Sequence, residues 1–229
     1  IPFRFWPPCP HSRAMSDSAP TEDPDSRLVA ALWQVVARHG WHGLTMRRVA
    51  AASGLPLAEI RRRCPSPLHL LRLHGRLVDL AVLEGTVPDQ GGQPRDRVFD
   101  VLMRRVDALQ PHRAGILRLL REARRDPLLG LLLLAELPGA MAWMLEAAEL
   151  DSAGLDGLLR VHGLAGIWLA TLRAWVRDGS ADLGPTMAAV DRALDRAEQI
   201  ARTIRLGPGE DGRDDDRELT VAARQQGLY

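Results

Sequence analysis

The chain has 229 residues, and its 30 basic and 29 acidic residues leave a net charge of +1, so bulk charge alone predicts no polyanionic partner. Two cysteines are too few for a disulfide framework or for a four-ligand zinc site of their own. The first twenty residues lack the apolar core of a secretory signal, and we expect a cytoplasmic protein.

The positive charge is concentrated in one part of the chain. Between Ser26 and Val78 there are nine arginines and a single acidic residue, Glu59, which gives this window a charge of +8. Such a window attracts the phosphates of nucleic acid whatever their sequence. The remainder of the chain is correspondingly acidic.

Residues 1–25 are rich in proline, serine and aspartate, and we expect them to be disordered. Four segments with apolar residues at helical spacing follow within 26–84. Capping and breaking residues mark the ends of these helices, namely Gly40, Thr45, Ser53-Gly54, Pro56 and Pro65. We therefore predict three short helices, the third from Leu57 to Arg63, and a longer fourth helix over 66–84.

The stretch "PDQGGQP" at 88–94 is a predicted linker, and helical patterns resume after it. They cover roughly 95–109, 111–125, 127–149, 153–178 and 182–206. The charged, aperiodic tail at 207–229 is expected to be disordered. The prediction is an all-α protein with a three-helix head and connecting helix over 26–84 and a helical bundle for ligand binding and dimerisation over 95–206.

The longest apolar run, "PLLGLLLLAELPGAMAWML" at 127–145, is about long enough to span a bilayer. It carries Glu136 and Pro138 near its centre, which disfavours a membrane span. We expect a buried helix with a kink.

Three short helices with a glycine turn between the second and third are typical of a helix-turn-helix unit. In such a unit the third helix enters the major groove of double-stranded DNA. Ile60 and Cys64 lie four residues apart and would face inward, which leaves Arg61 and Arg62 outward. An arginine fork binds guanine O6 and N7, while residues at the start of the second helix are placed for phosphates.

The stretch "LTMRRVAAASGLPLAEIRRRCPSPLHLL" resembles the DNA-binding domain of the TetR family of bacterial repressors over about fifty residues. The resemblance implies a DNA-binding transcriptional regulator with double-stranded DNA as its partner. It departs from the family pattern at four positions: Arg61 and Arg63 replace tyrosines, Cys64 a phenylalanine and Pro67 a lysine. The candidate DNA-binding residues are Thr45, Arg47, Arg48, Leu57, Glu59, Arg61, Arg62 and Arg63. The alternative is a degenerate unit that keeps its fold as a docking module.

The stretches "RDRVFDVLMRRVDALQPHR", "MAWMLEAAEL" and "GLAGIWLATLRAWVRDGSADLGPTMAAVDRALDRAE" look like the C-terminal region of the ubiquinone-biosynthesis accessory proteins. In that family a turn like Asp178-Gly179-Ser180-Ala181-Asp182 precedes a final amphipathic helix. This resemblance implies a lipid- or isoprenoid-binding protein that acts at a membrane surface. It supplies the alternative function, an accessory protein of ubiquinone biosynthesis.

The bundle region carries methionines and tryptophans on helical faces expected to point between helices, where they suit an adaptable apolar cavity. The candidate ligand-binding residues are Met103, Met141, Trp143, Met144, Trp168 and Trp175. Ordinary core packing is the alternative for each of them. An apolar or isoprenoid molecule is the expected ligand.

The last helix has one apolar stripe, which predicts a partner surface. Its members are Leu183, Met187, Val190, Leu194, Ala197, Ala201 and Ile204. The opposite face mixes acidic and basic residues, whereas a membrane-surface helix is usually more basic. We therefore predict a homodimer through the last two helices, in which paired heads contact successive major grooves.

Enzyme motifs are absent from the sequence. The seven histidines are scattered, and there is no HExxH, CxxC, GxSxG or phosphate-binding loop. We expect no catalytic residue, metal site or cofactor.

Overall fold

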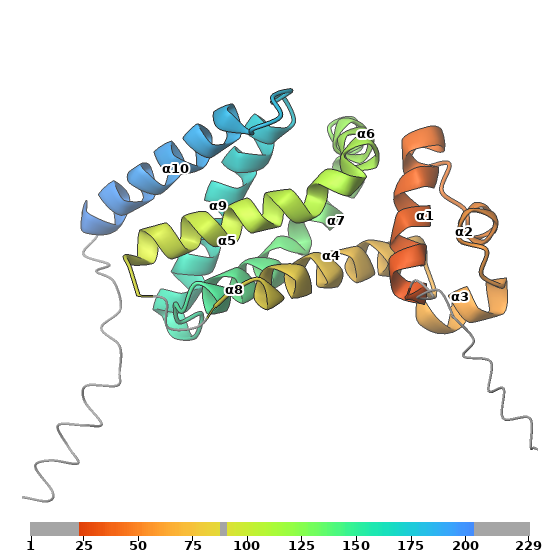
Figure 1. Cartoon of the computed structure of the whole chain (residues 1–229), viewed down its shortest axis with the longest axis horizontal. Helices are drawn as coiled ribbons and strands as arrows, with labels where there is room; N and C mark the ends of the chain where they lie inside the picture. The colour runs from red at the N-terminus through yellow and green to blue at the C-terminus, as the bar shows by residue number, and fades with distance from the viewer. Residues whose placement is uncertain (1–22, 88–90, 204–229) are drawn as a thin grey trace, which may run out of the picture.

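The computed structural model describes residues 23–87 and 91–203, and all regular structure in these ranges is helical (Figure 1). The predicted all-α class, a helix-turn-helix head followed by a helical bundle, is confirmed. Most of 1–25 and the whole of 207–229, both expected to be disordered, lie outside the described residues. Pro24 and Asp25 are exceptions, since the first helix begins at Pro24.

The helices form two groups joined by one long helix (Figure 1). The head consists of α1 (Pro24–His39), α2 (Met46–Ser53) and α3 (Leu57–Arg63). The connecting helix is α4 (Pro67–Glu84). The bundle consists of α5 (Pro94–Leu109), the short 3₁₀ helix η1 (Gln110–His112), α6 (Arg113–Ala123), α7 (Pro127–Ala135), α8 (Leu137–Ala147), α9 (Gly154–Trp175) and α10 (Gly184–Thr203).

Local capping separates the short helices of the head as the sequence predicts. Thr45 Oγ1 accepts a hydrogen bond from the Arg48 amide at 3.3 Å and caps α2. Gly54 ends α2 in the left-handed conformation, with φ 68° and ψ 13°, which glycine adopts without a steric penalty. The chain then turns into α3, whose Ile60 is buried beneath α1 and α2 together with Cys64. Burial raises the pKa of the Cys64 thiol.

The head is held to the bundle by close packing of α1 against α6. Gly115 of α6 lies directly on Trp33, so that an added Cβ would stand 2.7 Å from the Trp33 carbonyl oxygen. At the other end of this contact, the Trp41 amide donates to Glu122 Oε2 at 2.8 Å. Arg118 donates to Glu122 Oε1 at 3.1 Å and holds that carboxylate in place. The two helices therefore meet through backbone as well as side chains.

A cluster of three rings, those of Trp33, His74 and His112, joins α1, α4 and η1 at the same junction. The centroids of Trp33 and His74 are 4.8 Å apart, and those of His74 and His112 are 5.6 Å apart. Burial, helped by His112 and Arg105, lowers the pKa of His74 to about 3. His74 is therefore neutral at physiological pH and acts as a packing residue.

The expectation of one buried, kinked helix over 127–149 is wrong. The segment forms two helices, α7 and α8, that meet at Glu136. Leu129 is the one buried residue of α7 in the described part of the chain, whereas Leu128 and Leu131 are 66% and 64% exposed. Pro127–Ala147 is long and apolar enough to cross a membrane by length and composition, which is weak support for a span. Periodicity identifies an apolar helix but does not say what covers it.

The apolar stripe of α10, predicted to be free for a partner, is largely used within the chain. Leu183, Val190 and Leu194 are buried, and α10 packs against α9 and α5. Arg95 of α5 reinforces this contact with ion pairs to Asp191 at 2.6 Å and Asp195 at 2.7 Å. The last residue of the predicted stripe, Ile204, lies outside the described residues.

The turn between α9 and α10 is organised by the buried carboxylate of Asp178. Its Oδ1 accepts from the Ser180 amide and hydroxyl, at 3.0 and 2.5 Å. Its Oδ2 accepts from the Thr186 amide and hydroxyl, at 3.0 and 2.6 Å. The hydrogen bonds from Ser180 and Thr186 hold the pKa of Asp178 well below its usual range. The Asp-Gly-Ser-Ala-Asp sequence is thus explained by the hydrogen bonds through which Asp178 holds the turn and the first residues of α10.

Replacing Gly115 with alanine is predicted to lower the free energy of unfolding by about 1–3 kcal/mol, because the new methyl group forces α6 away from α1. The control is Gly75→Ala in the middle of α4, where an added Cβ meets no atom within 4 Å. That change should stabilise the protein by about 0.5–1 kcal/mol through higher helix propensity. Urea unfolding followed by circular dichroism measures both. Equal effects at the two positions would contradict the packing described here.

Candidate DNA-binding surface and bundle core

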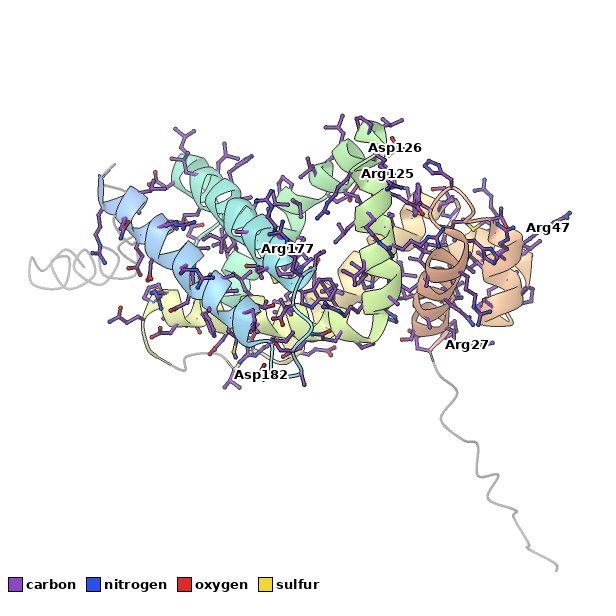
Figure 2. The ribbon with its side chains drawn as sticks, turned by 90° about the horizontal axis from the view of Figure 1, so that it is seen from above. Arg27, Arg47, Arg125, Asp126, Arg177 and Asp182 are labelled. Atoms are coloured by element: carbon purple, nitrogen blue, oxygen red, sulfur yellow. The ribbon has the colours of Figure 1, made fainter. Side chains whose placement is uncertain are left out.

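Two of the arginines predicted to contact DNA are free to bind a ligand. Arg47 on α2 and Arg62 on α3 are exposed and have no hydrogen-bond or ion-pair partner among the residues that the structure describes. Figure 2 shows Arg47 extending from the end of the head, away from the bundle. Leu57, the first residue of α3, is 46% exposed. These three candidates keep the accessibility that DNA contact requires.

Arg63 and Glu59 are instead engaged within the head. Arg63 Nη1 donates to Asp25 of α1 at 2.9 Å, and its Nε donates to Glu59 at 3.3 Å. The hydrogen bond to Asp25 raises the pKa of Arg63 above its ordinary value. Arg63 thereby ties α3 to α1, and Glu59 pairs with Arg63 within α3. Asp25 lies 38 residues earlier in the chain, so local spacing does not predict it as the partner of Arg63.

The remaining candidates of the head have local roles. Thr45 caps α2, and Arg48 donates from Nη1 to the Gly43 carbonyl oxygen in the preceding loop. Arg61 is exposed and donates to the Pro65 carbonyl oxygen at 3.1 Å. Its guanidinium retains other donors on the outer side of α3. Of the two arginines predicted to face DNA, Arg61 therefore has a hydrogen-bond partner within the head, whereas Arg62 has none among the described residues.

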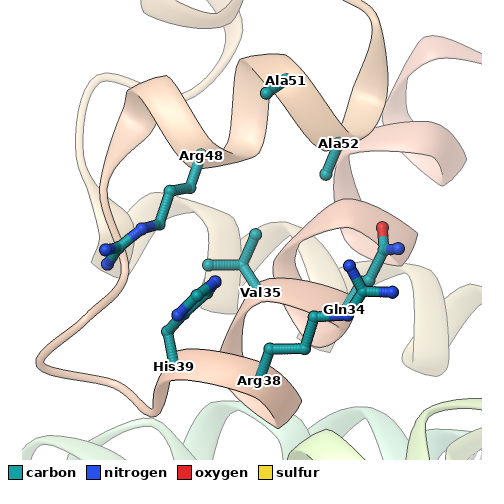
Figure 3. A pocket seen from close by; sticks show the side chains of 7 residues that line it. All are labelled: Gln34, Val35, Arg38, His39, Arg48, Ala51 and Ala52. Atoms are coloured by element: carbon teal, nitrogen blue, oxygen red, sulfur yellow. The ribbon is translucent and has the colours of Figure 1, made fainter.

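A hollow of about 370 Å³ lies on the head between α1 and α2 (Figure 3). Gln34, Arg38 and His39 of α1 border it on one side, and Arg48 and Ala51 of α2 on the other. Polar and basic groups line it, so it suits an anion or water better than an apolar molecule. A second hollow, of about 310 Å³, lies over α5 and α10. In residues 23–87 and 91–203 no group of three histidine, cysteine, aspartate or glutamate side chains is placed to hold a metal ion.

Neither hollow is bordered by the residues proposed for an apolar ligand. Met141, Met144, Trp168 and Trp175 are buried and fill the centre of the bundle, and Met103 is partly buried. The expectation that Trp143 points between helices is wrong, since it is 56% exposed on the outer side of α8. The reason is its place on α8, where Met141, Met144 and Leu145 occupy the inner side.

Arg105 is a buried residue of the bundle that the sequence analysis missed. Its side chain is 8% exposed, and its Nη1 donates to Asp79 Oδ1 of α4 and lies 3.5 Å from Met144 Sδ. Its guanidinium carbon stands 5.3 Å from the centre of the Trp168 ring. Arg105 therefore joins two of the proposed ligand residues. Its position in the apolar stripe of α5, in phase with Val98, Leu102 and Leu109, is the signal that could have identified it.

No protein-family model and no curated protein sequence matches the chain. Solved structures do match it. A TetR transcriptional regulator from Nitrosomonas europaea is 19% identical, with a TM-score of 0.62, and the match covers 78% of this chain and 99% of that one. A TetR transcriptional regulator from Rhodococcus sp. RHA1 is 18% identical, with a TM-score of 0.53, and the match covers 76% of this chain and 94% of that one.

These structures support the resemblance of the head to the TetR family. The likeness of the C-terminal region to ubiquinone-biosynthesis accessory proteins is not confirmed. At this level of identity the likeness is one of fold. The chain has the fold of TetR transcriptional regulators.

Proposed function

We propose that the protein is a cytoplasmic, non-enzymatic transcriptional regulator that binds double-stranded DNA through its helix-turn-helix head. The observation that carries the proposal is the pair of unengaged arginines, Arg47 and Arg62, on adjacent short helices of a head whose sequence window has a charge of +8. Free guanidinium groups on such a head supply both phosphate attraction and base recognition. A docking module would need neither.

The two arginines have different roles in this proposal. Arg62 lies on the outer side of α3, opposite the buried Ile60, and its fork is suited to guanine O6 and N7 in the major groove. Arg47 lies in the first turn of α2 and is suited to a phosphate. Arg61 adds a further basic group to the outer side of α3. Arg63 positions α3 through its bond to Asp25, and Glu59 pairs with Arg63 on the same helix.

A homodimer completes the proposal, because one head reaches only one half-site. The outer face of α9 supports it: Leu155, Leu158, Leu159 and Leu169 are exposed there. Gly166 lies on the same face with open space above it, which allows a second helix to approach closely. Met187 and Ile200 on α10 are also exposed. Large exposed apolar patches mark interaction surfaces.

We also propose that a ligand binds in the bundle and alters DNA binding. Met144 and Trp168 of the bundle core are the predicted ligand-binding residues that this proposal uses. The lipid-carrier alternative has weaker support. Three of the seven residues of its membrane-binding stripe, Leu183, Val190 and Leu194, are buried, and α10 packs against α9 and α5. No observation favours it over the regulator.

The direct test is selection of bound sequences from random DNA duplexes by the purified full-length protein at near-physiological salt. We expect enrichment of an inverted repeat whose half-sites are centred about one helical turn, or a multiple of it, apart. Enrichment of no sequence would overturn the regulator in favour of a degenerate head. Enrichment of a single half-site would overturn the dimer and leave DNA binding in place.

Arg62→Ala is predicted to weaken binding to the selected sequence by about 1–3 kcal/mol and to relax the preference at one base pair. Arg47→Ala should weaken binding to all sequences and reduce the slope of log K against log salt by about one. Fluorescence anisotropy over a salt series measures both effects. Arg124→Ala, an exposed arginine at the end of α6, is the control and should change neither. The same loss in all three variants would indicate nonspecific charge attraction only.

Leu159→Glu on α9 is predicted to convert the dimer to a monomer, because it places a charge in the centre of the proposed apolar interface. Leu80→Glu on α4 is the matched control, since Leu80 is 49% exposed and lies on another helix. Sedimentation velocity at micromolar concentration distinguishes the two states. A monomeric wild-type protein, or a Leu159→Glu variant that stays dimeric, would contradict this interface.

A further inference from the structure

We propose that Arg105 is the recognition residue for an amphipathic carboxylate, which binds in the bundle core at the edge of the guanidinium that Asp79 does not use. The inference rests on the proposed function in one respect, that the bundle binds an effector. It adds the chemical class of that effector and the residue that selects it.

The hydrogen bonding of Arg105 is incomplete on one side. A guanidinium has five N–H donors, and both contacts described for Arg105, to Asp79 and to Met144, use Nη1. Its Nε is buried without a partner among the described residues. The edge formed by Nε and Nη2 is one that a carboxylate can occupy with two parallel hydrogen bonds. Arg105 therefore presents an unused carboxylate-binding edge.

The charge of Arg105 distinguishes it from the other buried donors. Trp33 Nε1 and Trp175 Nε1 also lack an acceptor in the part of the chain that the structure describes. Each of these is a single neutral donor. An arginine removed from water loses much more hydration, so a second anion at its free edge recovers more free energy. Arg105 is accordingly the group in the core that gains most from an anionic ligand.

The surroundings determine the remainder of the ligand. Met144 and Trp168 contact the guanidinium, and Leu102 and Val106 beside it on α5 are fully buried. Burial, helped by the charge of Arg105, lowers the pKa of His74, so His74 is neutral and offers no competing charge. Apolar side chains favour an aliphatic or aromatic tail, while the guanidinium rejects a cation and gains little from a neutral head group. A carboxylate with an apolar tail meets both requirements.

The core is filled, so the ligand must move side chains to enter. Met144 has a flexible, adaptable side chain, and it lies on α8, which follows the sparsely buried helix α7. Because α7 has a single buried residue among those described, it can move away from the bundle at lower cost than the well-packed α8. Asp79 lies on α4, which also packs against α1 of the head. A second anion on the same guanidinium weakens its ion pair with Asp79, and therefore changes a contact on the helix that joins ligand site and head.

The test compares decanoate with 1-decanol, which have tails of the same length, on the full-length protein without DNA. Tryptophan fluorescence reports occupancy beside Trp168, and calorimetry gives the affinities. We expect decanoate to bind at least about tenfold more tightly, as a charge-assisted pair with Arg105 requires. Equal affinities for the two probes, or no binding of either, would overturn the proposal.

Substitutions at the two members of the ion pair are predicted to change decanoate binding in opposite directions. Arg105→Met should abolish the preference for decanoate, whereas Asp79→Asn should increase decanoate affinity severalfold because the competing carboxylate is gone. Arg124→Met, which removes an exposed arginine, should leave the preference unchanged. If Arg105→Met does not fold, the proposal is tested by the two probes on the wild-type protein and by the decanoate affinity of Asp79→Asn. A preference that survives Arg105→Met, or an Asp79→Asn affinity at or below the wild-type value, would refute the role of Arg105.

These measurements are independent of the DNA-binding proposal. A protein that enriches no DNA sequence can still show an Arg105-dependent preference for decanoate. A protein that enriches an inverted repeat but binds both probes equally would retain its regulator function and lose the inferred ligand class.

Discussion

The contact between α1 and α6 at Gly115 is the constraint on which the arrangement of the molecule depends. Only a residue without a side chain lets α6 lie on the backbone of Trp33, and the Glu122 bond to the Trp41 amide fixes the far end of that contact. The orientation of α1 influences those of α2 and α3, because α2 packs against α1 and α3 packs against α2. The direction in which Arg47 and Arg62 project from the molecule is therefore decided partly by the bundle.

The bundle in turn contains a charge that its packing does not require. A buried arginine costs free energy unless its partners compensate for lost hydration. Asp79 supplies one anionic partner and Trp168 a ring face, but the Nε edge has neither. A core built for stability alone is usually better served by an apolar residue at such a position. The retention of Arg105 fits a site whose second anion comes from outside the chain.

The exposed apolar side chains of α7 and α9 form surfaces that a partner can cover. An all-round apolar helix such as α7 is normally covered, and the leucines on the outer side of α9 are too many for an ordinary surface. Along α10, by contrast, the apolar stripe faces its own bundle. Of the last two helices, where a partner surface is predicted, α9 carries more exposed large apolar side chains than α10.

Local signals in the sequence were sufficient for the helices and for the class of the fold. Thr45, Gly54 and Pro65 act on residues three or four positions away, so the breaks of the helix-turn-helix unit can be predicted without knowing any long-range contact. The outward placement of Arg62 follows from the inward placement of Ile60 for the same reason. These parts of the candidate site could be derived from spacing alone.

Tertiary structure decided which of the predicted residues remain free. Arg63 is engaged by Asp25, 38 residues away, and Arg105 meets Asp79, Met144 and Trp168 from three other helices. Helical periodicity gives each helix an apolar side but does not say which helix will cover it. For that reason Trp143, predicted to face inward, is exposed, whereas Leu183, Val190 and Leu194 of the stripe predicted to meet a partner are buried within the chain. The sequence determined the elements and their faces, and only the packing of one face on another determined which groups the molecule leaves available.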